Sequence, residues 1–209
     1  LAILLKILGI FLSLFDPIVR LCYQKQTQDI EIQKEVWSER LGRSLDVFWD
    51  ENKSQFGVTV ERTSAFLNWR IFQNPNIKYN FFSTYQDDIL VGYIITRQAE
   101  SDFPAGVIVD VIAKENNPHI IDALVKQAIL DFGERNISYI TFKALKANGI
   151  LNQAFSRLGF FNADKFLSIL NKKSTQSELL IYTHADDLEG SLSEPDDWYY
   201  SELFCEGFI

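Results

Sequence analysis

The chain has 209 residues, a length typical of one large domain or two small ones when a domain averages roughly 150 residues. With 47% hydrophobic and 14% aromatic residues it can bury a core, which argues against a disordered chain. The formal net charge of -8 argues against a non-specific nucleic-acid binder, because such proteins carry a basic stripe. The sequence has no Met and begins at Leu1, so we expect it to be part of a longer protein.

The residue types that most often hold metals or carry nucleophilic chemistry are scarce. The two cysteines, Cys22 and Cys205, are spaced for neither a zinc site nor a redox pair. Only His119 and His184 could supply imidazole, and neither lies in a nucleophile motif, so we expect no metal. We expect two reduced thiols in a cytoplasmic protein; a single disulfide between the cysteines is the alternative.

The first fifteen residues, 1–15, are the most apolar part of the chain. They are too short to span a membrane, which takes about 20 residues, and no cleavage site for a signal peptide follows them. Their polar positions fall at steps of three and four, which predicts a helix that is apolar nearly all round. Such a helix is covered by its own domain, by a missing upstream domain or by a membrane surface. We assign residues 1–30 to this helix and a linker, as the end of a missing upstream region.

The pattern from residue 31 onward predicts alternating strands and helices. We expect a strand at 31–37, helices at 46–56 and 62–72, and a β-hairpin with strands at 79–85 and 89–97. The run 106–113 is mostly β-branched, as in a strand covered on both faces. A helix with the apolar face Ile120–Phe132 follows and closes at Gly133, and a strand is expected at 137–142. A helix over 148–158 closes at Gly159, and two further strands are expected at 165–170 and 178–183.

This order predicts one mixed α/β domain over residues 31–209, with an antiparallel first part and a βαβ unit in the middle. The tail from residue 184 is acidic and then aromatic, with the run Trp198-Tyr199-Tyr200 near its end. Aromatic residues are usually buried, so we expect the tail to return and pack on the domain, over one side of the sheet.

Two stretches of sequence carry a family resemblance. The run 148–161, NGILNQAFSRLGFF, is similar to the second acetyl-CoA motif of the GNAT acyltransferases, in which an Asn opens a helix that ends in Leu-Gly-Phe. The stretches Val60–Arg70 and Val91–Ile95 resemble the C-terminal domain of a bacterial two-domain acyltransferase-like subgroup of that superfamily. The resemblance implies the GNAT acyl-CoA N-acyltransferase fold over roughly residues 31–183, with acetyl-CoA or another acyl-CoA as cofactor.

The cofactor loop of the family departs from its usual pattern in this sequence. The family places two glycines and an Arg or Gln where a helix start holds the pyrophosphate; here those positions are His119, Ile121 and Asn116. Asn117 and Pro118 suit the start of a helix, so a well-capped structural helix is the alternative interpretation. The resemblance implies that the following residues contact the cofactor: Ile112, Ala113, Asn117, His119, Ile120, Asn148 and Phe155. For Asn148, an ordinary helix cap is the alternative.

The catalytic groups that the resemblance implies are only partly present. Many GNAT enzymes use a tyrosine four residues before the helix-ending glycine as general acid, and here Phe155 stands in that place. Asp110 stands where a carboxylate often acts as general base, and burial among β-branched neighbours would raise its pKa. The alternative is a structural Asp110 that bonds an amide or an Arg. Four further residues are candidates for the acceptor site, with surface or core roles as the alternative: Trp69, Arg70, Tyr93 and Arg97.

Two functions follow from these observations. The first is an acyl-CoA-dependent N-acyltransferase that moves an acetyl or acyl group to a small amine or amino sugar. The alternative is a non-catalytic GNAT-like domain that binds the acceptor or forms a domain interface in a tandem protein. The expected partners are a small-molecule acceptor amine and the missing upstream domain, with no nucleic acid. A peripheral membrane contact through residues 1–15 is the weakest expectation.

Overall fold

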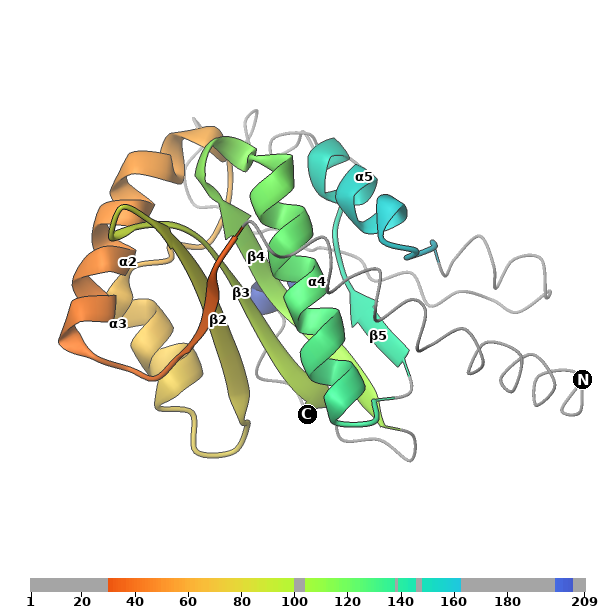
Figure 1. Cartoon of the computed structure of the whole chain (residues 1–209). Coiled ribbons are helices and arrows are strands. Elements are labelled where there is room, and N and C mark those ends of the chain that lie inside the picture. The colour runs from red at the N-terminus through yellow and green to blue at the C-terminus, as the bar shows by residue number, and fades with distance from the viewer. Residues whose placement is uncertain (1–29, 100–103, 138, 146–147, 163–197, 205–209) are drawn as a thin grey trace, which may run out of the picture.

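A computed structural model describes residues 30–99, 104–137, 139–145, 148–162 and 198–204. Its centre is a sheet in the order β1-β2-β3-β4-β5. The first four strands are antiparallel, and β5 runs parallel to β4. Figure 1 shows this sheet, whose strands are β1 (Ile32–Glu35), β2 (Tyr79–Gln86), β3 (Ile89–Ala99), β4 (Ala105–Ala113) and β5 (Tyr139–Phe142).

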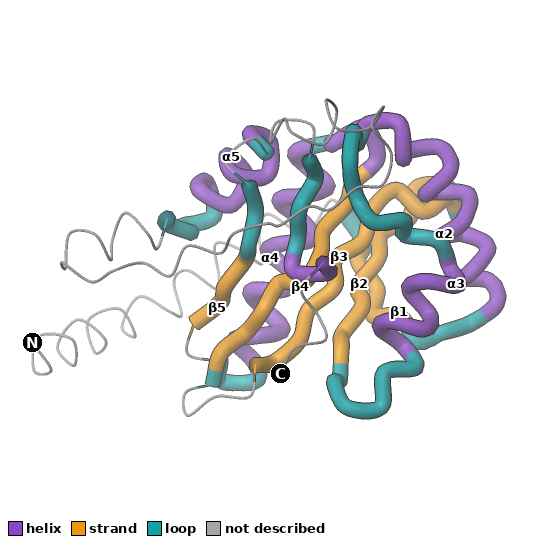
Figure 2. Tube along the Cα trace, turned by 180° about the vertical axis from the view of Figure 1, so that it is seen from behind, coloured by secondary structure: helices purple, strands orange, loops and turns teal. Residues whose placement is uncertain are grey.

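Helices cover both faces of the sheet (Figures 1 and 2). On one face lie α2 (Glu39–Asn52) and α3 (Ser64–Leu67), where Phe48 of α2 packs edge-on against Tyr93 of β3. On the other face α4 (Pro118–Glu134) crosses β3 and β4, and α5 (Gly149–Arg157) packs beside α4. The unit β4-α4-β5 is the βαβ unit that the sequence predicted, and the strands before it form the predicted antiparallel part.

The β2–β3 hairpin confirms the turn that the polar run Gln86-Asp87-Asp88 predicted. Asp87 and Asp88 have φ values of 50° and 65°, in the left-handed region. Two-residue hairpin turns with positive φ match the right-handed twist of strands, and Asp tolerates that conformation. The turn sets the pairing of Gln86 with Ile89 and of Tyr85 with Leu90. A register shift between Tyr85 and Thr84 then gives the pairing from Thr84 opposite Gly92 to Tyr79 opposite Arg97.

Strand β4 is the centre of the core. All nine of its residues are buried, as the β-branched run predicted for a strand covered on both faces. Both β4 and its neighbour β3 come so close to α4 that each has a glycine at the point of contact. A Cβ added at Gly106 would lie 2.7 Å from the Cε1 atom of Phe132, and one added at Gly92 would lie 2.7 Å from the Cγ2 atom of Ile120.

The two helices before the hairpin differ from the sequence prediction in their bounds. The helix predicted at 46–56 begins at Glu39, because Ser38 caps it by accepting a hydrogen bond from the Leu41 amide at 3.1 Å. It ends at Asn52, and a 3₁₀ turn, η1 (Lys53–Gln55), follows. The helix predicted at 62–72 is capped by Thr63 and becomes a π-helix, η2 (Asn68–Phe72), after α3.

The sequence predicted that Gly133 would end α4 and that Gly159 would end α5. Gly133 does not end α4, which runs on to Glu134, and Asn136 takes the left-handed conformation instead, with φ of 55°. Gly159 does end α5, with φ of 87° one residue after the cap at Leu158.

Several predictions fall outside the described residues: the apolar helix at 1–15, the strands at 165–170 and 178–183, His184 and both cysteines. Within the described ranges, no helix combines the length and the apolar character needed to cross a membrane.

We expect Gly106→Ala to destabilise the fold by about 1–3 kcal/mol, the usual range for overpacking a filled core. The added Cβ would press on the ring of Phe132, a fully buried residue of α4. The free energy of unfolding from urea denaturation measures this loss. The matched control is Gly149→Ala at the start of α5, where an added Cβ meets no atom within 4 Å. Equal stability of the two variants would contradict the packing argument.

Candidate functional site

The site lies where β4 and β5 part. The two strands pair from Ala105 opposite Tyr139 to Ile108 opposite Phe142, and there β5 ends. Strand β4 continues to Ala113 in its pairing with β3. The last residues of β4 therefore carry a backbone edge that has no partner strand among the described residues.

Part of this edge is covered by a segment from the end of the chain. Residues 198–204, which we call the C-terminal strap, include the 3₁₀ turn η6 (Glu202–Phe204). Tyr199 donates its amide to the Val58 carbonyl at 2.9 Å and its hydroxyl to the Val111 carbonyl of β4. On the other side of the gap, the Lys143 ammonium lies 2.9 Å from the Glu202 carboxylate. The strap thus bridges β4 and the end of β5, and confirms that the tail returns to the domain.

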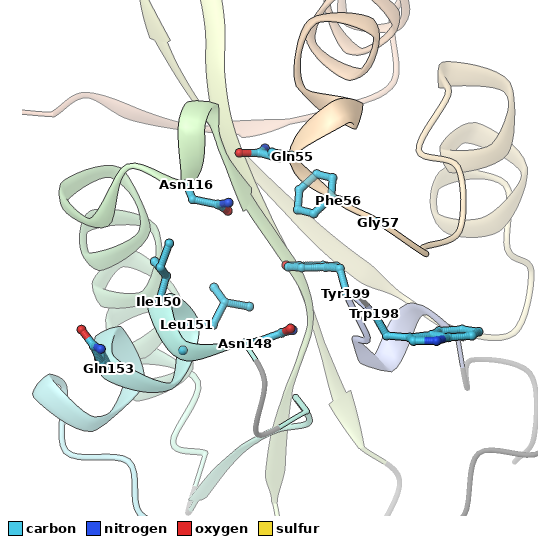
Figure 3. A pocket seen from close by; sticks show the side chains of 11 residues that line it. Gln55, Phe56, Gly57, Asn116, Asn148, Ile150, Leu151, Gln153, Trp198 and Tyr199 are labelled. Atoms are coloured by element: carbon cyan, nitrogen blue, oxygen red, sulfur yellow. The ribbon is translucent and has the colours of Figure 1, made fainter. Parts of the chain in front are cut away.

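A cavity of about 340 Å³ opens between the strap, η1 and the start of α5. Figure 3 shows the hydroxyl end of Tyr199 directed toward the α5 side of the cavity, and the amide ends of Asn116 and Asn148 reaching in from that side. The lining combines aromatic rings, aliphatic groups and carboxamides, and none of its side chains is charged. Its members are Gln55, Phe56, Gly57, Asn116, Asn148, Gly149, Ile150, Leu151, Gln153, Trp198 and Tyr199.

A buried ion pair lies beneath the strap. The Nε of Arg62 is 2.8 Å from Oδ2 of Asp110, and its Nη2 is 3.2 Å from Oδ1. Both side chains have 0% exposure. Arg62 also donates to the Thr59 hydroxyl and the Val60 carbonyl, each at 2.6 Å, so four hydrogen bonds compensate its desolvation.

Aromatic rings enclose this pair and complete its polar contacts. The Tyr93 hydroxyl donates to Oδ2 of Asp110 at 3.2 Å. The guanidinium carbon of Arg62 lies 5.0 Å from the ring centre of Tyr199, and the Trp49 and Phe56 rings lie at 5.7 and 5.9 Å. Cation–π contacts of this kind strengthen when water is excluded.

The pair sets the protonation of its neighbours. Burial disfavours the charge of Arg62, but the attraction and hydrogen bond of the Asp110 carboxylate, together with Tyr93 and Tyr199, outweigh burial and raise the pKa of the guanidinium. Burial, and then the negative charge of Asp110, raise the pKa of Tyr93 and of Tyr199 well above the ordinary tyrosine value. Both hydroxyls are therefore neutral and able to donate at physiological pH.

These contacts correct the candidate role of Asp110 as a general base. Both of its oxygens are bound to Arg62, and it has no surface from which to reach an acceptor amine. The structure shows the alternative that the sequence left open, a carboxylate paired with an Arg. Asp110 is not among the residues that line the cavity.

The start of α4 has the geometry of a self-capped helix. Asn117 accepts a hydrogen bond from the His119 amide at 2.9 Å through its side chain, and its carbonyl accepts one from the Ile121 amide. Pro118 brings no amide. Ile121 is buried in the core, and Ile120 packs over Gly92 of β3. Anion binding at this end of α4 is limited to amides that the cap leaves open.

Asn148 and Phe155 both belong to the α5 motif, but only Asn148 lines the cavity. The Asn148 side chain makes no capping bond, which removes the alternative that it is an ordinary cap, and its Nδ2 is buried without a partner at the cavity. Phe155 stacks on Phe142 with ring centres 4.0 Å apart and meets Phe160 edge-on. It is buried and does not line the cavity.

The other predicted residues lie away from the cavity lining. Ile112 and Ala113 are buried residues at the end of β4 that has no partner strand on the β5 side, and the Ala113 carbonyl accepts from Gln55 Nε2 at 3.4 Å. Tyr93 is a core residue. Trp69 has 63% exposure on η2, with Arg70 over its ring, and Arg97 lies near the far end of β3. The structure therefore brings only Asn148 of the predicted set into the cavity lining.

Sequence reasoning missed Gln55 and Tyr199. Gln55 lies in η1, a turn at the end of α2 with no motif of its own. Tyr199 could have been found from the sequence, because it belongs to the aromatic run Trp198-Tyr199-Tyr200, which we expected to pack on the domain.

No protein-family model matches the sequence, and a search of curated proteins finds no match. Solved structures do resemble the fold. A ribosomal-protein-alanine N-acetyltransferase from Brucella melitensis biovar Abortus 2308 aligns with a TM-score of 0.52 at 14% identity, over 74% of this chain and 99% of its own. A probable acetyltransferase aligns at 0.54 with the same identity and coverage. A transcriptional regulator from Bacillus halodurans C-125 aligns at 0.50 and 14% identity, over 73% of this chain and 100% of its own.

Likeness at this identity establishes the fold and leaves activity open. The chain has the GNAT acetyltransferase fold, as its α5 motif predicted. The two-domain subgroup stays a prediction.

We expect Arg62→Met to lower the free energy of unfolding by about 3–5 kcal/mol, because it leaves the Asp110 carboxylate buried and unpaired. The same change at Arg40 is the control, since the Arg40–Asp88 pair is 73% and 90% exposed and contributes little. Chemical denaturation of both variants measures the difference. A loss at Arg62 no larger than at Arg40 would contradict the structural role of the pair.

Proposed function

We propose that the protein is an acyl-CoA-dependent N-acyltransferase that acetylates a small acceptor amine. The observation that carries this proposal is the cavity at the parting of β4 and β5, bounded by the starts of α4 and α5, in a GNAT acetyltransferase fold. Parallel α/β units bind ligands where the carboxyl ends of their strands diverge. Acetyl-CoA supplies an activated acetyl group and a thiolate leaving group.

The residues around the cavity suit acetyl-CoA, the acyl donor, in two respects. Beyond Ile108, β4 has no partner strand on the β5 side among the described residues, and the amides of an unpaired strand edge are suitable donors to a thioester carbonyl. The Nδ2 of Asn148 is a buried donor without a partner at the α5 side. The loop before α4 contributes less, because the cap at Asn117 already uses the His119 amide.

We assign the proton-donating role to Tyr199. Tyr199 lines the cavity, and its hydroxyl is bound to the last stretch of β4. The raised pKa keeps this hydroxyl protonated but makes it a weak acid, so it gives up its proton only as another proton replaces it. Many GNAT enzymes have a tyrosine general acid at the position of Phe155. Here Phe155 is a ring in an aromatic stack, and Tyr199 supplies the proton instead. In the balanced reaction the bond from sulfur to the acetyl carbon breaks as the nitrogen–carbon bond forms. The Tyr199 O–H bond breaks as the S–H bond forms, and Tyr199 Oη regains the proton that the amine nitrogen loses, so that no phenolate remains beside Asp110.

We expect Tyr199→Phe to lower kcat for acetyl transfer by about 10²–10⁴-fold, the usual contribution of a positioned general acid. The phenyl ring keeps its contacts with Arg62 and Phe56, so acetyl-CoA affinity should change little. Thiol release measured with a chromogenic disulfide reports kcat, and calorimetric titration reports affinity.

The matched control is Tyr85→Phe, which removes a hydroxyl bound to Glu35 on the other side of the sheet. An unchanged kcat in the Tyr199 variant would refute its role as acid. Absence of acetyl-CoA binding at millimolar concentration would refute the enzyme and favour the non-catalytic domain.

A further inference from the structure

The start of α4 is the helix end beside the cavity where the phosphates of a CoA donor would bind. Amides in the first turn of a helix lack partners within the helix and attract anions, together with the helix dipole. Asn116, which comes just before the Asn117 cap of α4, lines the cavity, and Figure 3 shows it in the turn that leads into this helix. An anion that extends from the cavity toward α4 would meet the amides of this turn.

The protein itself occupies most of those amides. The positions that lack a partner within α4 are residues 117–120. Asn117 donates its amide to the Lys114 carbonyl at 2.9 Å. Pro118 has no amide hydrogen, and the His119 amide donates to the Asn117 side chain at 2.9 Å. Three of the four positions in this described turn are thereby closed to a phosphate.

A side-chain oxygen closes the turn before α4 in the same way. Glu115 and Asn116 have φ values of 53° and 52°, and successive amides in such turns form anion-binding concavities. Here the Glu115 amide donates to Oδ1 of Asn52 at 3.3 Å. Asn52 is buried at the end of α2, and its Nδ2 donates to the Phe48 carbonyl at 2.8 Å, which fixes Oδ1 toward the turn. A carboxamide oxygen thus takes the place of an anion's oxygen.

The charged side chains at this end of α4 are matched in sign. Lys114 and Glu115 follow one another in the turn. Arg157 of α5 makes hydrogen bonds of 2.8 and 3.3 Å to Asp122, in the second turn of α4. Neither pair adds net positive charge, so neither supplies the unopposed cation that strengthens the binding of a phosphate.

We infer that the protein recognises its acyl donor by the thioester and the pantetheine arm, and gains no affinity from the pyrophosphate. The donor class is therefore a pantetheine thioester, of which acetyl-CoA is one member and S-acetylpantetheine another. The inference rests on the proposed acetyl transfer, and the bonds that change are the same. The bond from sulfur to the acetyl carbon breaks, the nitrogen–carbon bond forms, and the leaving thiol takes its proton from Tyr199, as pantetheine in place of CoA.

The test compares acetyl-CoA with S-acetylpantetheine by calorimetric titration of the whole chain. The second donor carries the same thioester and arm without the nucleotide. We expect the two dissociation constants to agree within about three-fold, because the start of α4 leaves the phosphates few amides to bind.

Asn117→Gly provides a second measurement on the same two donors. It removes the oxygen that occupies the His119 amide, and glycine at a helix cap costs little stability. We expect it to raise the affinity for acetyl-CoA about two- to five-fold, the usual effect of an anion at a helix N-terminus, and to leave S-acetylpantetheine unchanged. Ser38→Gly, the same kind of change at the cap of α2, is the control and should alter neither affinity.

Binding of acetyl-CoA about ten-fold or more tightly than S-acetylpantetheine would overturn the inference and uphold acetyl transfer. If that preference is lost in His119→Ala, the imidazole at the start of α4 holds the phosphates. An acetyl-CoA affinity that Asn117→Gly leaves unchanged would contradict the account of the closed turn. If neither donor binds at millimolar concentration, the proposed function fails and the inference fails with it.

Discussion

The ion pair between Arg62 and Asp110 is the interaction on which the rest of the site depends. It joins the loop after α2 to the central strand β4 at a place where no water can screen the charges. A buried pair is stabilising only when further hydrogen bonds satisfy it. Thr59, Val60 and Tyr93 provide them, and the ring of Tyr199 closes the cluster. The pair thereby fixes both the loop that carries the cavity wall and the strap that covers it.

The sheet and its helices follow from local signals in the sequence. The β-branched run at 106–113, the Asp87-Asp88 turn and Gly159 each specify their element through backbone preference, and each is confirmed. Errors fall at helix ends, where a single side chain decides. With Ser38 as its cap, α2 starts at Glu39, seven positions before the predicted Asp46. Leu41 and Leu45 extend the three- and four-residue spacing of the apolar face back to this first turn, a signal that the prediction did not use.

The site was less predictable because it is assembled from segments that are distant along the chain. Asn148 could be identified from the sequence because its motif lies in one continuous segment, residues 148–161. Gln55 and Tyr199 meet at one cavity from positions 144 residues apart, 199 minus 55, and only the folded sheet relates them. Asp110 shows the converse: its place on β4 was predicted, but its partner Arg62 turns a candidate base into a structural carboxylate.

The position of the strap, residues 198–204, affects the order in which parts of the structure form during synthesis. Chains fold as they leave the ribosome, beginning with their N-terminal part. All five strands of the described sheet precede residue 143, so the sheet can form before the strap has been synthesised. Until residue 199 emerges, the aromatic cover of Arg62 and one wall of the cavity are missing. A nascent chain would therefore acquire its architecture early and its binding site only as translation nears Phe204.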